Sequence, residues 1–175
     1  FEGMFSFAIF DKKNNSIFAA RDRMGVKPFF YLSSYNNFFF SSRPKAILKL
    51  NRNMTKTFDD NAINIYLSAG YVPAPLSIYK NLRQLPAGSY LYWKSDKIKI
   101  KKWWDLNSIS VDKDERIKPL EIYEEELESC FLDSIKKRLI SDVPVGVFLS
   151  GGIDSSLITA LVQKIQKDKK FHKTQ

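Results

Sequence analysis

The sequence SGGIDSS at residues 150–156 has the composition of a loop that binds phosphate. It follows an apolar run at residues 143–149, which predicts a short strand buried on both faces. It precedes apolar residues at helical spacing between Leu157 and Ile165. Two glycines let an anion approach main-chain N–H groups, and the serines add hydroxyl donors at the positive end of a helix. The segment therefore predicts a nucleotide-binding loop between a strand and a helix.

Asp154 is the unexpected residue of this loop, because a carboxylate repels a phosphate unless a cation lies between them. It predicts either a Mg²⁺ contact or an N-cap for the helix. A Walker loop is excluded, since Ile153 and Asp154 stand where that motif has lysine followed by serine or threonine. A dinucleotide-binding fingerprint is excluded because GxGxxG does not occur. A strand-to-helix turn without a ligand remains the alternative for the Ser-Gly-Gly tripeptide alone.

The first part of the chain has the patterns of antiparallel β-structure. Three hairpins are predicted, at residues 5–20, 28–40 and 89–100. The second contains too many aromatic rings to be solvated on both faces, so its sheet must be covered. Trp103 and Trp104 are expected to anchor the third.

Two helices are predicted before the loop. The shorter one opens with Thr57 as its cap, ends at Gly70, and carries an apolar stripe of Ile63, Tyr66 and Leu67. A polar stretch at residues 112–118 then indicates a boundary. Beyond it, one long amphipathic helix is expected, with an apolar stripe formed by Leu120, Tyr123, Leu127, Phe131, Ile135 and Leu139. Cys130 is expected on the apolar side as a packed thiol rather than a nucleophile.

SGGIDSS matches the SGGxDSS loop of the ATP pyrophosphatases, enzymes that split ATP to AMP and pyrophosphate while adenylating a substrate. Together with the approach SDVPVGVFL at residues 141–149, it resembles the synthetase domain of the glutamine-hydrolysing asparagine synthetase family. Further segments resemble that family in the same order. Residues 3–11 and 20–31 are similar to the end of its glutaminase domain, and residues 70–75 and 85–91 to the connection between its domains.

The resemblance implies a fold in two parts. An α+β N-terminal part, with the antiparallel β-structure that ends an Ntn-type glutaminase, is followed by the start of an α/β parallel-sheet ATP-pyrophosphatase domain. The implied divisions are residues 1–56 for the glutaminase, 57–115 for the connection with its hairpin, and 116–175 for the synthetase.

The resemblance also implies ATP and Mg²⁺ as ligands and amidation of aspartate as the reaction. The residues implied to bind ATP are Leu149, Ser150, Gly151, Gly152, Asp154, Ser155 and Ser156, with Asp154 as the Mg²⁺ ligand. No catalytic residue is assigned, because the family's N-terminal cysteine nucleophile is absent from this sequence. A piece of a longer protein, with little or no turnover of its own, is therefore expected. The alternative acceptor is another carboxylate, such as a sugar acid in surface-polysaccharide synthesis.

Two segments need their own interpretation. Arg21-Asp22-Arg23 could clamp a substrate, but a loop-bracing ion pair in the scaffold is favoured. Arg43 stands where the family usually has glutamate. This reversed charge leaves the usual domain contact and the acceptor open.

The composition sets the remaining bounds. With 175 residues, 44% of them hydrophobic, the chain is expected to be globular, and no apolar run is long enough to cross a bilayer. A cytoplasmic protein without membrane partners is expected, and the resemblance allows a homodimer of the full-length protein. The net charge of +9 leaves a basic module that binds nucleic acid as the other class, but scattered lysines disfavour nucleic acid as a partner. His172, the only histidine, gives no support to a metal cluster.

Overall fold

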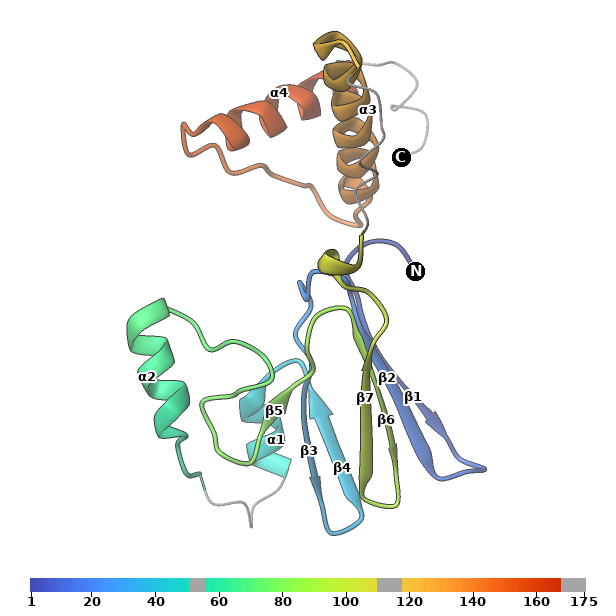
Figure 1. Cartoon of the computed structure of the whole chain (residues 1–175), viewed down its shortest axis with the longest axis vertical. Helices are drawn as coiled ribbons and strands as arrows, with labels where there is room; N and C mark the ends of the chain where they lie inside the picture. The colour runs from blue at the N-terminus through green and yellow to red at the C-terminus, as the bar shows by residue number, and fades with distance from the viewer. Residues whose placement is uncertain (51–55, 110–117, 168–175) are drawn as a thin grey trace. The chain divides into compact units, whose positions relative to one another are not determined.

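The computed structural model describes residues 1–50, 56–109 and 118–167. The chain forms two compact units, Phe1–Val111 and Asp112–Gln175, and each is described by itself (Figure 1). Of the predicted boundary at residues 112–118, all but Lys118 lies outside the described residues.

Antiparallel strands make up the centre of the first unit. One sheet has the order β1 (Ser6–Asp11), β2 (Ser16–Arg21), β6 (Ser89–Lys94), β7 (Lys97–Lys102), and the other has the order β4 (Asn37–Ser41), β3 (Phe30–Ser34), β5 (Arg83–Gln84). The three predicted hairpins are confirmed as β1–β2, β3–β4 and β6–β7. Positive φ at Tyr35 and Asn36, and at Ser95 and Asp96, produces tight turns that suit the strand twist.

The main core lies between these two sheets. From the first sheet it contains Ile17, Ala19, Leu91 and Trp93, and from the second sheet and the loops beside it Phe29, Tyr31 and Leu85. The indole Nε1 of Trp93 donates to Ser33 Oγ at 2.9 Å, which satisfies the polar atom that the ring brings into the core. The hairpin at 89–100, although it falls within the predicted connection 57–115, thus packs in the same sheet as β1 and β2. The division of residues 1–115 at residue 56 stays a prediction.

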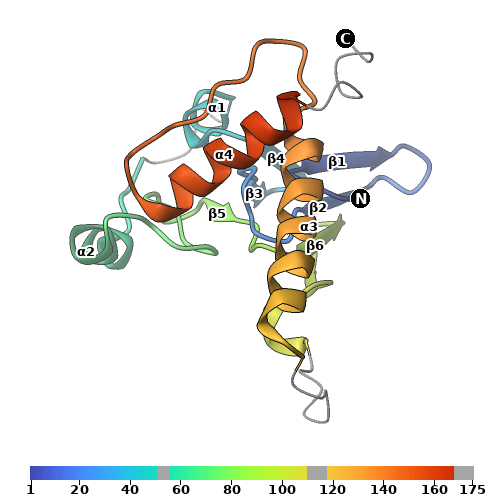
Figure 2. The same ribbon diagram turned by 90° about the horizontal axis from the view of Figure 1, so that it is seen from above.

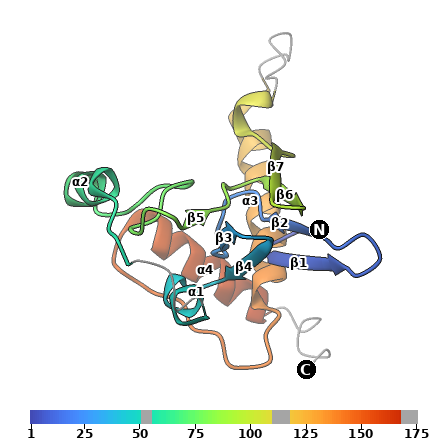
Figure 3. The same ribbon diagram turned by 90° about the horizontal axis from the view of Figure 1, so that it is seen from below.

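The aromatic hairpin β3–β4 is covered on both faces. One face meets the first sheet, where Phe38 lies 5.5 Å from Trp93 between ring centroids. The other meets α1 (Pro44–Leu50), whose Ile47 is fully buried with Leu32 and Leu82. Figures 2 and 3 show α1 and the β1–β2 hairpin on opposite sides of β3–β4. The expectation that this sheet must be covered is therefore confirmed.

The predicted short helix is α2 (Asp60–Ala69), but its cap is Asp59 rather than Thr57. The carbonyl of Thr57 accepts from Lys80 N, and Asp59 N donates to Ile78 O, each at 3.0 Å. This pairing keeps the chain extended through Asp59, so the helix cannot start earlier. Gly70 ends the helix as predicted, in the left-handed conformation with φ 77°.

The apolar stripe predicted for α2 is mostly exposed. Tyr66 and Leu67 are 53% and 76% exposed, Ile63 is only partly buried, and Ala62 is the buried residue. Contacts that secure the helix lie at its first turn, where the Asp59 carboxylate accepts from Ala62 N at 3.1 Å. The rest of α2 extends away from the sheets (Figure 1), which leaves its apolar side chains in solvent.

Arg21 and Asp22 brace the loop that follows β2 as the favoured interpretation expects, but the ion pair that it also expects is not formed. The Arg21 guanidinium donates to the carbonyls of Gly25, Lys27 and Leu85. The Asp22 carboxylate accepts from the N–H groups of Val26 and Lys27 at 2.9 and 3.0 Å. The bracing therefore runs through main-chain hydrogen bonds rather than through a direct ion pair.

Trp103 and Trp104 anchor the chain after β7, as predicted. The backbone N–H groups of both donate to Gly88 O, at 2.8 and 3.1 Å. The indole of Trp103 donates to Arg21 O at 3.3 Å and stacks on Phe5. A short 3₁₀ turn, η1 (Leu106–Ser108), follows.

We expect the stability of the first unit at acid pH to depend on Asp22. Burial raises the pKa of its carboxyl, but hydrogen bonds from Lys27 and Val26 outweigh burial and hold the pKa below the ordinary 3.8. A lowered pKa stabilises the fold above roughly pH 4, and this contribution is lost as the pH falls through the folded-state pKa. Thermal melts between pH 5 and pH 2 should therefore show a falling Tm that Asp22→Asn flattens. The same change at Asp60, an exposed carboxylate in a surface ion pair, is the control, and equal slopes for both variants would contradict the prediction.

The second unit consists, in its described part, of two packed helices. The predicted long helix is confirmed as α3 (Leu120–Leu139), and α4 (Ile153–Lys167) follows the loop. Ile135 of α3 is buried against Leu161, Val162 and Ile165 of α4. The apolar stripe is only half confirmed, because Leu120, Tyr123 and Leu127 are exposed beyond the reach of α4. Among the described residues no helix is long and apolar enough to cross a membrane.

The strand predicted at residues 143–149 is absent, and this segment is extended chain with every residue exposed. A strand needs neighbours for its N–H and C=O groups, and within residues 118–167 no strand is present to pair with it. The apolar run is consequently left in solvent, with Phe148 98% exposed.

Cys130 is exposed, so its prediction as a packed thiol is wrong. Phe131, Leu132 and Ile135 form the side of α3 that meets α4, and Cys130 points away from it.

We expect the folded chain to react with a thiol reagent such as DTNB at one site and at the rate of an exposed cysteine. A thiol that reacts only after urea is added would show that the helix buries this side.

Candidate nucleotide-binding loop

The segment SGGIDSS lies where the extended chain turns into α4. Gly151 has φ 85°, a left-handed conformation that residues with a side chain rarely adopt, and the helix begins at Ile153. A Cβ at Gly151 would meet no atom within 4 Å. Glycine is thus required by the turn itself, and its backbone is open to an approaching ligand.

The start of α4 offers unpaired main-chain donors. The N–H of Ser156 donates to Gly152 O at 3.1 Å and closes the first turn. The N–H groups of residues 152–155 consequently have no acceptor within the helix. They lie at the N-terminal end of a helix of 15 residues. This end carries a partial positive charge, which favours the binding of a phosphate. Both glycines are exposed, so a ligand can reach these groups.

The serines of the loop differ in their availability. Ser155 Oγ donates to Gly152 O at 3.1 Å and lies 3.1 Å from Ser150 Oγ. Because a hydroxyl has one proton, Ser150 is the donor of that pair. Ser156 is exposed and has no hydrogen-bond partner for its side chain among the described residues. Of the predicted hydroxyl donors, Ser156 is available to a ligand as it stands. Ser155 becomes available once its hydroxyl rotates away from the Gly152 carbonyl.

Asp154 lies within the first turn of α4, one residue after the helix begins, so it is not the N-cap. Its carboxylate is exposed and makes no hydrogen bond or ion pair with the described residues. Over this same part of the chain, no group of three or more His, Cys, Asp and Glu could hold a metal ion. One free carboxylate next to unpaired main-chain amides fits Mg²⁺, which commonly takes one or two carboxylates and completes its coordination with phosphates and water.

Leu149, the remaining residue of the predicted site, precedes the loop and is 62% exposed. Its backbone lies beside the turn, where an adenine ring would be expected if the segment formed a strand. The structure thus brings all seven predicted residues together because they are contiguous, and their assignment to ATP stays a prediction.

Two surface features of the first unit were not predicted from the sequence. One is a hollow lined by three lysines, among them Lys45 and Lys49 on α1. The other is an aromatic groove over β1, β2 and β6 that includes Phe5, Phe7 and Tyr90. The alternation in β1 indicated the strand but not which face would stay open. Arg43, the departure from the family pattern, lies immediately before α1.

Two protein families match the chain, and each match lies within one of its two compact units. Residues 1–104 match the glutamine amidotransferase domain, and residues 126–174 match asparagine synthase. The antiparallel sheets and helices of the first unit are compatible with a glutamine amidotransferase domain. The second match contains the whole of SGGIDSS.

Similar curated proteins carry the same two functions in their names. A putative glutamine-hydrolysing asparagine synthetase 2 of Methanocaldococcus jannaschii is 41% identical over 98% of this chain and 33% of its own length. Asparagine synthetase 3 of Bacillus subtilis, also glutamine-hydrolysing, is 36% identical over 91% of this chain and 25% of its own length. Asparagine synthetase B of Escherichia coli is 28% identical over 93% and 24%.

The chain therefore belongs to the family of glutamine-hydrolysing asparagine synthetases. It spans between a quarter and a third of the length of the first two of these relatives.

Proposed function

We propose that this chain functions within an ATP-dependent, glutamine-hydrolysing enzyme that converts aspartate to asparagine through a β-aspartyl-adenylate. The observation that carries the proposal is the open backbone of Gly151 and Gly152 at the N-terminus of α4. The family membership and the names of the relatives support the reaction class.

In this mechanism the loop binds the pyrophosphate end of ATP. A carboxylate oxygen of the aspartate side chain attacks the α-phosphorus, the bond to the bridging oxygen breaks, and pyrophosphate leaves. Main-chain N–H groups at residues 152–155 and the hydroxyls of Ser155 and Ser156 stabilise the charge on the leaving group. Asp154 would hold Mg²⁺, and the bound ion would neutralise part of the phosphate charge. Ammonia released from glutamine then attacks the acyl carbon, and AMP leaves.

We propose the same division of labour along the chain as the sequence predicts. Residues 1–56 belong to the glutaminase, residues 57–115 to the connection, and residues 116–175 to the ATP-pyrophosphatase domain. In that domain residues 143–149 become a strand of a parallel sheet, because neighbouring strands would satisfy their backbone groups and bury the exposed Phe148 and Leu149. This places the loop at the carboxyl end of a strand, where nucleotides bind in α/β sheets.

The test uses a full-length protein that contains this sequence, supplied with ATP, Mg²⁺, glutamine and aspartate. We expect asparagine and pyrophosphate in equal amounts. Pyrophosphate release with a sugar acid but not with aspartate would show that the acceptor is a sugar acid and that the adenylation chemistry is as proposed. No ATP consumption with any carboxylate would overturn the proposal.

A further inference from the structure

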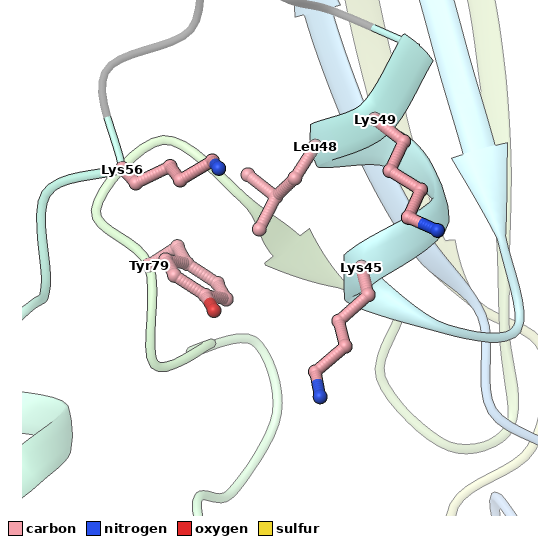
Figure 4. Close-up of a pocket in the computed structure, with 5 residues that line it drawn as sticks. All are labelled: Lys45, Leu48, Lys49, Lys56 and Tyr79. Carbon is pink, nitrogen blue, oxygen red and sulfur yellow. The ribbon is translucent and has the colours of Figure 1, made fainter.

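A hollow of about 430 Å³ in the first unit combines positive charge with an apolar lining. Figure 4 shows the five residues that line it. Lys45, Leu48 and Lys49 come from α1, whereas Lys56 and Tyr79 come from two separate stretches of the connection that follows. Lys45 extends from α1 toward the side of Tyr79, and Lys56 reaches across toward Leu48 (Figure 4). Side chains from three parts of the sequence therefore converge on one hollow.

The positive charge of this hollow meets no carboxylate in the part of the chain that the structure describes. None of its three lysines forms an ion pair with a carboxylate of the described residues. The nearest acidic residues along the chain already have partners. The carboxylate of Asp59 accepts from Ala62 N, and that of Asp60 lies 3.8 Å from Lys80 Nζ. Unpaired ammonium groups around a concave surface raise the local concentration of anions.

The apolar part of the hollow is firmly held. Leu48 is buried, with 7% of its surface exposed. The ring of Tyr79 stacks on Phe58 with 5.5 Å between centroids, which holds the ring in place. The phenol oxygen of Tyr79 faces the hollow and adds a hydrogen-bonding group (Figure 4). An apolar lining with a few polar groups is typical of small-molecule sites, and the volume lies within their usual range of roughly 300–1,000 Å³.

We propose that this hollow binds a small organic phosphate, with the phosphate at the lysine ammonium groups that line it and the organic body against the ring of Tyr79. Lysine acts toward phosphate as a point charge. Two lysines therefore attract a phosphate dianion more strongly than they attract a carboxylate, which carries a single negative charge. Lys49 also lines the hollow, from the same helix as Lys45, and adds to its positive charge. The concave shape favours a small ligand over the flat face of a macromolecule.

All the residues that line the hollow belong to the Phe1–Val111 unit, whereas SGGIDSS belongs to the Asp112–Gln175 unit. The phosphate site goes beyond the proposed function and does not depend on it. A ligand bound there would act on the first unit whether or not the loop of α4 binds ATP.

The test titrates this chain with phenyl phosphate, inorganic phosphate and phenol by calorimetry. We expect phenyl phosphate to bind more tightly than either of its halves. Lys45→Gln and Lys56→Gln should each weaken it about tenfold, the effect of losing one hydrogen bond to a charged group. Both lysines are exposed, so neither change should disturb the fold. Lys99→Gln, at an exposed lysine on β7, is the matched control and should leave the affinity unchanged.

Several results would overturn the proposal. One is the absence of phenyl phosphate binding, and another is equal weakening by all three lysine substitutions, which would indicate attraction to net charge alone. Binding of polyglutamate without binding of phenyl phosphate would assign the hollow to an acidic macromolecule. Loss of phenyl phosphate binding in Gly152→Ala, with none in Lys45→Gln, would place the ligand at the loop of α4 instead.

Discussion

Gly151→Ala, made in a full-length protein that contains this chain, should lower the rate of aspartate-dependent pyrophosphate release by about 100-fold or more. The backbone at Gly151 has φ 85°, so a Cβ there forces the turn toward another conformation even though no atom stands within 4 Å. That shift moves the N–H groups at the start of α4 away from the departing pyrophosphate. The measurement is the initial rate of pyrophosphate release at saturating ATP, Mg²⁺ and aspartate.

Gly70→Ala is the matched control for this prediction. Gly70 has φ 77° and, like Gly151, has no atom within 4 Å of a built Cβ, but it ends α2 in the other unit. Both substitutions should cost about 1–2 kcal/mol of stability. Only Gly151→Ala should reduce the rate. An equal loss of activity in both variants would mean that backbone strain, and not phosphate binding, explains the effect.

Gly152→Ala separates ligand approach from strain. A Cβ at Gly152 would lie 3.7 Å from Ser150 Oγ and 4.0 Å from Ser155 Oγ, which is ordinary van der Waals contact. The folded loop therefore tolerates the methyl group. A rate loss in this variant without a change in stability would reflect shielding of the main-chain donors.

The sequence was sufficient to predict structure that local patterns determine. Alternating residues with polar turns gave the three hairpins, and the long amphipathic pattern gave α3 over its full length. The loop at residues 150–156 was predicted whole, because its residues are contiguous and their types carry the chemistry. Strand β5, with two residues, and α1, with seven, are too short for periodicity to indicate them.

Predictions failed where a partner decides the outcome. Residues 143–149 have the composition of a buried strand, but in the described part of their unit no other strand pairs with them. Thr57 and Asp59 are both good cap residues, and the pairing of residues 57–59 with the chain near Tyr79 selects the second. The lysine hollow needs α1, residue 56 and Tyr79 to meet. Lys56 lies near Tyr79 because Phe58 bridges with Tyr79, and α1 joins them through the core of Ile47 and Leu82. No local pattern reveals either contact.

Arg21→Met should lower the free energy of unfolding of the first unit by about 3–5 kcal/mol. The Arg21 side chain is 6% exposed and donates to three carbonyls, at 2.8 Å to Lys27, 2.5 Å to Leu85 and 2.5 Å to Gly25. Burial lowers the pKa of its guanidinium and the adjacent Asp22 opposes this, but arginine stays charged in proteins. Methionine fills similar space without any donor, so these carbonyls and the buried Asp22 lose their compensation.

Arg23→Met is the control with identical chemistry. Arg23 is exposed and its guanidinium lies 5.9 Å from the centroid of the Trp103 ring, a contact worth about 0.5–1 kcal/mol at such sites. Arg21→Lys tests the geometry, because lysine keeps the charge but cannot reach three carbonyls with one fork. It should recover only a small part of the loss.

All three tryptophans lie in the first unit, at residues 93, 103 and 104, so fluorescence during urea unfolding reports on this unit alone.

The comparison of these variants decides what the arginine does. Arg21 joins the end of β2 to the loop at Gly25 and to Leu85, which lies next to β5 of the other sheet. If Arg21 holds the two sheets together, Arg21→Met should lower the urea midpoint of unfolding strongly. Arg23→Met should change this midpoint only slightly. Equal midpoints for the two variants would show that the carbonyls find water when the guanidinium is removed. The sheets would then be held together by their apolar core, with Trp93 and Tyr31 at its centre, and not by this hydrogen-bonded arginine.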